Sequence, residues 1–165
     1  MSAFSSKKQA LGLLAWLAVC FIVSAIGAVA SVQARSFYGQ LVRPEWSPPG
    51  SVFGPVWTAL FTLMAIAAWL VWRQGGLRAN RGALGLFLVQ LGFNALWSWL
   101  FFAWKLGAWA LADIALLWVL IGLTLVAFWQ SNRLAALLLV PYLLWVSFAF
   151  ALNYAMWQFN PYLLG

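Results

Sequence analysis

A stripe of polar and aromatic side chains near the middle of the chain is the clearest candidate for chemistry. Gln90, Asn94, Trp97 and Phe101 are separated by four, three and four residues, which places them on one face of a helix. Asn94 lies near the midpoint of a long apolar run, where a carboxamide is costly if it faces lipid. We therefore expect Asn94 either to face an internal cavity, as a hydrogen-bonding group for a ligand, or to bond a neighbouring helix.

Aromatic side chains follow the same helical spacing in two other apolar runs. Phe53 and Trp57 share one face, and Trp145, Ala149 and Leu152 share another. Because Ala149 is small and one turn away from Trp145, it leaves room beside the indole ring. An indole N–H inside a span needs an acceptor, since an unpaired donor in hydrocarbon costs several kcal/mol. Two interpretations remain open: ordinary core packing, or a flat apolar slot for a planar aromatic or sterol-like ligand.

The remaining reactive side chains exclude most enzyme chemistry. The chain contains no His, one Cys and two carboxylates, Glu45 and Asp113. That set is too small for a His-ligated metal, a Cys-His or Ser-His nucleophile pair, or a glycosidase carboxylate pair. We therefore expect no metal site. Asp113 is the only acid inside an apolar run, and it is expected to pair with a cation such as Lys105 or with backbone donors.

Five membrane-spanning helices are the elements that must position these side chains. The chain has 165 residues, of which 66% are hydrophobic and 7% charged, whereas soluble domains average roughly 45–50% and about 25%. A helix of about 20 apolar residues crosses a bilayer, and the apolar runs lack the alternation of a membrane β-barrel. The sequence therefore predicts an all-α integral membrane protein with one domain over residues 1–165. The expected spans cover approximately residues 10–31, 52–72, 82–104, 108–130 and 134–158.

The connection over residues 32–51 is the longest, and we expect it to be a stiff loop. It contains three of the six prolines, which fix φ and restrict the residues before them. Long loops in compact folds are often functional, so one interpretation is a lid that carries Tyr38 and Trp46 above the bundle. The other is an interfacial anchor, because Trp and Tyr favour the level of the lipid headgroups. The two interpretations weigh equally.

The basic side chains predict how the chain is oriented in the membrane. The formal net charge is +7, and the cations lie between the apolar runs. By the positive-inside rule, the N-terminus is expected inside and the C-terminus outside, in a bacterial cell membrane. Because topology and lipid headgroups account for the charge, no nucleic-acid partner is expected. The cations on the N-terminal side are Lys7, Lys8, Arg73, Arg78, Arg81 and Arg133, and those on the other side are Arg35, Arg43 and Lys105.

Two glycines in the third span are candidates for a close helix contact. Gly85 and Gly92 are seven residues apart on one side of that span. Small residues let helix backbones approach each other closely in a membrane. A homodimer contact through this helix and packing within one chain are both consistent with the spacing.

Four stretches, in order along the chain, resemble those of the TspO/translocator protein family, also called tryptophan-rich sensory proteins or peripheral-type benzodiazepine receptors. The resemblance covers nearly the whole chain and the five expected spans. The stretches are Arg43-Pro44-Glu45-Trp46-Ser47-Pro48-Pro49-Gly50, Phe53 with Trp57-Thr58-Ala59-Leu60-Phe61, Phe93-Asn94-Ala95-Leu96-Trp97-Ser98, and Val140-Pro141-Tyr142-Leu143-Leu144-Trp145 with Leu152-Asn153-Tyr154.

The resemblance implies a five-helix bundle, usually a homodimer, with a cavity under the first loop that binds porphyrins, sterols and synthetic benzodiazepine-site drugs. Tyr38 and Trp46 would then belong to the lid. Trp57 and Trp145 match tryptophans implicated in the family's oxidative, light-dependent porphyrin breakdown. No basic residue closely follows Tyr154, as one does in the sterol pattern of some relatives, so sterol binding is doubtful. The resemblance implies a cavity lined by Trp57, Asn94, Trp97, Trp145, Ala149 and Leu152, to which the helical face of the second run adds Phe53.

We therefore expect a membrane receptor, translocator or sensor that binds tetrapyrroles and similar planar apolar ligands. A macrocycle would stack on Trp57 and Trp145, Asn94 would offer an amide hydrogen bond, and Arg35 or Arg43 would pair with propionates at the mouth. Without His, free-base porphyrins should bind at least as well as haem, and neither is a required cofactor. The alternatives are oxidative porphyrin degradation through Trp57 and Trp145 and, with thinner support from Asp113, a small proton-coupled exporter.

Overall fold

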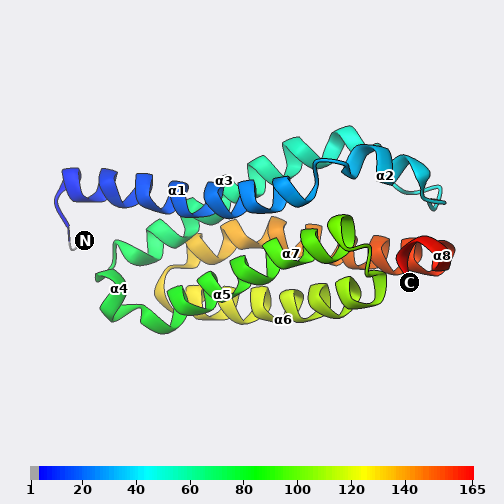
Figure 1. The fold of residues 1–165 in the computed structure, drawn as a ribbon. Coiled ribbons are helices and arrows are strands. Elements are labelled where there is room, and N and C mark those ends of the chain that lie inside the picture. Colours follow the sequence, from blue (N-terminus) through cyan, green and yellow to red (C-terminus); the bar gives the residue numbers. More distant parts are fainter. Residues whose placement is uncertain (1–3) are drawn as a thin grey trace.

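Five long helices make up most of the computed structural model, which describes residues 4–165 (Figure 1). Each is long and apolar enough to cross a membrane when the short turns that continue α3 and α5 are included. The prediction of an all-α, five-helix membrane bundle is therefore confirmed. With those turns included, the spans begin and end within four residues of the expected ones. The long helices are α1 (Ser6–Ala30), α3 (Phe53–Trp72), α5 (Arg81–Ser98), α6 (Gly107–Ser131) and α7 (Arg133–Phe159).

Five short elements join or extend these helices. A 3₁₀ turn leads into α3, and a π-helical turn continues α5, so the α3 and α5 spans run over residues 50–72 and 81–103. The α-helix α2 lies within the connection over residues 32–51, which was expected to be a stiff loop. The short elements are α2 (Ala34–Gln40), η1 (Gly50–Val52), α4 (Gly76–Ala79), η2 (Trp99–Ala103) and α8 (Pro161–Leu164).

The spanning helices alternate in direction, so the two ends of the chain lie at opposite ends of the bundle (Figure 1). α1 packs against α3 and α5, α6 packs against α5 and α7, and α3 also packs against α7. The short α4 lies at the end where α1 begins, whereas α2 and α8 lie at the other end. This arrangement leaves α1, α3 and α5 side by side beneath α2.

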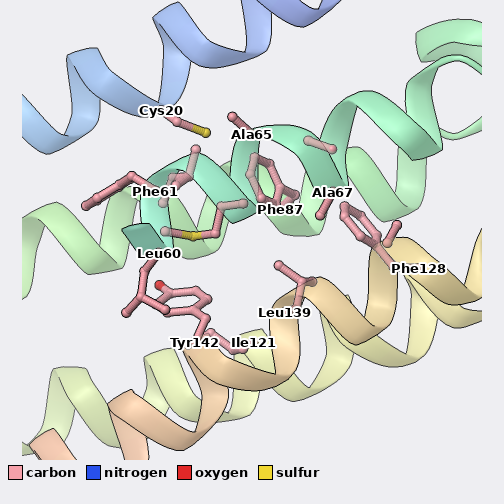
Figure 2. Packing of buried hydrophobic residues seen from close by; sticks show 14 of the residues in the cluster. Cys20, Leu60, Phe61, Ala65, Ala67, Phe87, Ile121, Phe128, Leu139 and Tyr142 are labelled. Carbon is pink, nitrogen blue, oxygen red and sulfur yellow. The ribbon is translucent and has the colours of Figure 1, made fainter. Parts of the chain in front are cut away.

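Apolar side chains from all five spanning helices meet inside the bundle (Figure 2). Phe87 of α5 stacks on Phe128 of α6 with ring centroids 5.8 Å apart, and Cys20 of α1 is fully buried. Gly12 of α1 lies against the side chain of Trp72 of α3, and a Cβ atom at this position would overlap the Trp72 ring. The bundle is thus closely packed at the end opposite α2, which leaves the α2 end to hold a cavity.

The helix α2 forms because one of its faces is buried. Phe37 and Leu41 are one turn apart, and both are buried, with Tyr38, in a cluster that includes Leu152 and Met156 of α7. A seven-residue helix is marginal on its own in water, so this burial against α7 is what stabilises it. The prolines that follow α2 predict a stiff loop, and their pattern gives no sign of the short helix that precedes them.

Candidate functional site

A cavity of about 390 Å³ lies between α1, α3 and α5, beneath α2. Its wall is mostly apolar, with aromatic rings from α3, α5 and η2 facing small residues from α1. The volume falls at the lower end of the roughly 300–1,000 Å³ that small-molecule sites occupy. The lining residues are Val23, Ser24, Gly27, Ala28, Ser31, Ala34, Arg35, Tyr38, Gly50, Phe53, Gly54, Trp57, Thr58, Phe61, Asn94, Trp97, Ser98 and Phe102.

Residues 32–51, here called the roof segment, cover this cavity and are held by hydrogen bonds of Tyr38, within α2, and of Val42, just after α2. Tyr38 lines the cavity, and its hydroxyl donates a hydrogen bond to the carbonyl oxygen of Pro48 at 2.8 Å. Asn160 holds the chain just after α2: its Oδ1 accepts from the Val42 N–H at 2.8 Å, and its Nδ2 donates to the Val42 carbonyl at 2.9 Å. The roof segment is therefore tied to the C-terminal end of α7.

Two arginines in the roof segment have different positions. Arg35 is exposed and lines the cavity, so its guanidinium lies at the mouth. Arg43 does not line the cavity, and its guanidinium lies over the ring of Tyr38, 4.7 Å from the centroid. Trp46 is about half exposed and packs edge-on against Phe148 of α7, with ring centroids 5.8 Å apart. Of these three side chains, only Arg35 can reach a ligand in the cavity directly.

Asn94 faces the cavity and also joins two helices. Its Nδ2 donates to the Tyr142 hydroxyl at 2.8 Å, and that hydroxyl donates to Gln90 Oε1 at 2.7 Å. Tyr142 and Gln90 are fully buried, and Asn94 is almost so. Asn94 therefore meets both expectations: its Nδ2 forms a hydrogen bond to α7, and the residue also lines the cavity. The network holds the amide of Asn94 in one orientation.

Two tryptophans form the aromatic wall of the cavity. Trp57 of α3 contacts Phe61 and Tyr142, with ring centroids 5.9 Å and 6.4 Å away. Trp97 of α5 stacks on Phe101 at 5.4 Å, and its N–H donates to Asn153 Oδ1 of α7 at 2.9 Å. Both rings are thus held by neighbours and present a preformed surface to a ligand.

Three expected lining residues lie outside the cavity wall. Trp145 lies behind Phe53, with ring centroids 5.9 Å apart, and its buried N–H has no hydrogen-bond partner within residues 4–165. Ala149 belongs to the main core and Leu152 to the cluster beneath α2. Because Phe53 does line the cavity, one aromatic ring separates Trp145 from the space that a ligand would enter.

The prediction that Asp113 pairs with a cation such as Lys105, or with backbone donors, is wrong. The Asp113 side chain is buried, and neither carboxylate oxygen has a hydrogen-bond partner in the described part of the chain. Lys105 sits at a turn with φ +55°, and its ammonium group lies over the ring of Phe37, 5.0 Å from the centroid. That position directs the ammonium toward α2. Within residues 4–165 no group of three or more Cys, Asp or Glu side chains could hold a metal ion.

The α1 wall of the cavity was missed from the sequence. It consists of Ser24, Gly27, Ala28 and Ser31, together with Val23. Four of these are small residues at positions i, i+3, i+4 and i+7, which is one face of a helix. This spacing could have predicted the α1 wall from the sequence, because small residues opposite an aromatic stripe leave space between two helices.

Comparison with known proteins gives a consistent match over most of the chain. Residues 16–158 match the model of the TspO/MBR family, a range that includes every residue lining the cavity. The Tryptophan-rich protein TspO of Chlorobaculum tepidum is 42% identical over 160 residues, covering 94% of this chain and 99% of that protein. The Translocator protein of Homo sapiens is 40% identical over 126 residues, 75% of each chain. The Tryptophan-rich sensory protein of Cereibacter sphaeroides is 37% identical over 147 residues, 89% of this chain and 90% of that one.

Proposed function

Because the chain belongs to the TspO/MBR family, we propose that its cavity binds porphyrins and similar planar apolar ligands within the membrane. Family membership supports a membrane receptor or sensor role, and the five apolar helices make the chain an integral membrane protein. The observation that carries the proposal is the composition of the cavity wall. Trp57 and Trp97 face it with one amide, Asn94, and one cation, Arg35, at its mouth.

The aromatic wall supports a flat ligand rather than a flexible chain. Trp57 and Trp97 offer ring faces whose positions are already fixed by their neighbours. An offset-stacked aromatic pair contributes about 0.5–1.5 kcal/mol beyond its buried area. Opposite them, the small side chains of α1 leave room for the thickness of a planar ring. A preformed slot of this kind loses little conformational entropy when it binds.

The polar groups of the cavity suit the edge of a porphyrin. Arg35 would pair with a propionate at the mouth, where water still screens the charges. The Oδ1 atom of Asn94 accepts no hydrogen bond from the described residues, so it is free to accept one from a ligand N–H. No His is present in the chain, so these groups favour a free-base macrocycle as strongly as an iron complex.

We propose that a bound macrocycle also displaces Phe53 and reaches Trp145. The cavity is small for its class, and Phe53 is the ring that stands between it and Trp145. Moving Phe53 would extend the slot toward an indole N–H that lacks an acceptor. Ala149, one turn away from Trp145, would then border the enlarged space. Trp46, on Phe148, would close it from the roof segment.

Quenching of tryptophan fluorescence by protoporphyrin tests the site. The wild-type protein should be quenched on titration, and Trp57→Phe should weaken the affinity. Trp118→Phe is the matched control, because Trp118 is 45% exposed on α6 and donates to Ser147 Oγ at 2.8 Å. Absence of quenching in the wild type would refute the proposal, and unchanged affinity in Trp145→Ala would refute its extension behind Phe53. Loss of porphyrin absorbance under light or oxidant would instead indicate breakdown.

The role of Arg35 is tested with two forms of the ligand. Arg35→Gln should weaken binding of protoporphyrin by up to about fivefold, because an exposed ion pair contributes about 0.2–1 kcal/mol. The same variant should bind protoporphyrin dimethyl ester as the wild type does. Arg43→Gln serves as the control, since its guanidinium lies over Tyr38 outside the cavity lining. An equal loss for the acid and the ester would exclude the propionate contact.

We propose that two copies of the chain pair through α5. A Cβ atom at Gly85 or Gly92 would meet nothing within 4 Å, so neither glycine serves packing within the chain. Leu88 and Val89, on the same helix, are 46% and 48% exposed. Gly85→Leu should therefore reduce the dimer fraction measured by light scattering. Gly122→Leu on α6, where the space is equally open, should leave it unchanged, and the same fraction in both variants would exclude α5 as the contact.

The orientation in the membrane is also a proposal, supported by the unequal charge of the two ends. Six cations lie at the end where α1 begins, against three at the end that carries α2. By the positive-inside rule, the N-terminus would lie inside and the C-terminus outside, and we propose that the membrane is that of a bacterial cell. Reporter fusions at the two termini would overturn this if they gave the opposite orientation.

A further inference from the structure

The end of the bundle where α1 begins, here called the basic end, carries six cations and no acid. The only two acids in the chain are distant from it: Glu45 belongs to the roof segment, and Asp113 lies within two turns of the start of α6, at the α2 end. In Figure 1 the basic end is the one marked by α4. Its cations come from the starts of α1, α5 and α7, from α4 and from the end of α3. They are Lys7, Lys8, Arg73, Arg78, Arg81 and Arg133.

Helix ends add to this positive charge. α1, α5 and α7 all begin here, and none has an acidic residue in its first turn. A helix N-terminus carries about half a positive charge and favours anions nearby. Here each first turn holds a cation instead. The carboxyl ends of α3 and α6 also lie here and carry about half a negative charge each, so the three amino ends leave a small positive excess. No acidic side chain accompanies the six cations at this end, which favours an anion from outside the chain.

Two of the cations each lie over an aromatic ring, in a group made of Phe4, Trp69 and Trp72 that is here called the aromatic platform. The Lys8 ammonium lies 4.1 Å from the Phe4 ring centroid, and Phe4 packs on Trp72 with centroids 4.7 Å apart. Arg73 follows Trp72 in the chain and lies over Trp69, 4.7 Å from its centroid. The Trp69 N–H donates to the Gln9 carbonyl at 2.9 Å, which joins the two halves of the platform. The rings hold both cations in place without neutralising them.

We propose that the basic end binds anionic phospholipids, with a headgroup phosphate held by Lys8 and Arg73 on the aromatic platform. The platform continues into an apolar flank of α1, where Leu11 and Leu14 are 67% and 61% exposed. Leu11 is one turn beyond Lys8, so acyl chains would lie on α1 directly below the phosphate. A free phosphate ion would be bound by the two cations alone. A phospholipid would gain binding free energy from the cations and also from contact of its acyl chains with the apolar flank of α1. This assignment does not depend on what the cavity binds.

Native mass spectrometry of the full chain tests the proposal. The protein in neutral detergent is titrated with phosphatidylglycerol and, separately, with phosphatidylcholine. We expect the wild type to prefer phosphatidylglycerol. Because each basic residue near an anionic lipid surface contributes a factor of about five, the double variant Lys8→Gln/Arg73→Gln should lose roughly 25-fold of that preference. The charge-preserving variant Lys8→Arg/Arg73→Lys should keep most of it and shows that the fold is intact.

The control removes two cations from the other end of the bundle. Arg43 and Lys105 also lie over aromatic rings, those of Tyr38 and Phe37, so Arg43→Gln/Lys105→Gln makes the same charge change on the same kind of support. This control should retain the lipid preference. The proposal is overturned if the wild type shows no preference, if both double variants lose it equally, or if inorganic phosphate at the lipid's own concentration displaces phosphatidylglycerol.

Discussion

Replacing Asn160 with Ala should loosen the roof segment while leaving the five-helix bundle folded. The Asn160 side chain is 5% exposed and makes two hydrogen bonds to the backbone of Val42, at 2.8 Å and 2.9 Å. A third bond, from Nδ2 to the Met156 carbonyl, closes the end of α7, but that carbonyl also accepts from the Asn160 backbone N–H. The tie to Val42 is therefore the interaction that the variant removes.

The size of the effect follows from the exposure of Val42. Its side chain is 62% exposed, so water can reach the N–H and carbonyl groups that Asn160 releases. The cost is then the net value of two hydrogen bonds, about 1 kcal/mol each, and not the larger penalty of burying unpaired groups. A loss of about 2 kcal/mol raises the population of the open roof roughly 30-fold. The buried Phe37 and Leu41 keep the closed state dominant.

Hydrogen exchange measured by mass spectrometry on the protein in nanodiscs reads this population directly. The backbone amides of Leu41, Val42, Arg43, Glu45, Trp46 and Ser47 should exchange roughly 30-fold faster in Asn160→Ala than in the wild type. The control is Asn132→Ala, because Asn132 caps α7 at the opposite end by accepting from the Ala135 N–H at 3.0 Å. Losing that cap costs about 1 kcal/mol of stability without touching the roof. Equal exchange in Asn160→Ala and the wild type, or equal acceleration in both variants, would refute the reasoning.

Two further substitutions should change the unfolding midpoint in detergent. Tyr142→Phe leaves Gln90 Oε1 and Asn94 Nδ2 buried without partners, at about 1–3 kcal/mol for each group; an unchanged midpoint would mean that the network relaxes freely. Gly12→Ala pushes a Cβ atom into the Trp72 ring and should destabilise the contact between α1 and α3 by about 1–3 kcal/mol. A midpoint at or above that of the wild type would show that this ring moves aside at no cost.

The spanning helices were predictable because run length alone specifies them. A bilayer requires about 20 apolar residues per helix, and the short connections between the last three spans allow little choice of boundary. α2 was not predictable in the same way. Its seven residues become helical because Phe37 and Leu41 are buried against the distant α7, and no local pattern reports a partner more than 100 residues away.

The aromatic wall was only partly predictable for a related reason. Helical spacing grouped Trp57 with Phe53 and Asn94 with Trp97, and the structure places all four in the lining of one cavity. The same spacing also predicted Trp145, but a helical face does not say which layer a side chain occupies. Phe53 reaches the cavity first and covers Trp145 from α3. That order depends on how α3 and α7 are rotated against each other.

The hydrogen bonds of the tryptophans indicate where a ligand would complete the structure. Trp69, Trp97, Trp118 and Trp157 each donate to an acceptor within the chain. Among the buried side-chain donors of residues 4–165, only the N–H of Trp145 lacks a partner. An unpaired donor in a medium without water costs several kcal/mol, and neither an anchoring role nor core packing requires that cost. A ligand that moves Phe53 and offers an acceptor to the Trp145 N–H would remove this cost. The Trp145→Ala titration therefore tests whether the ligand forms this hydrogen bond as well as whether Trp145 borders the bound ligand.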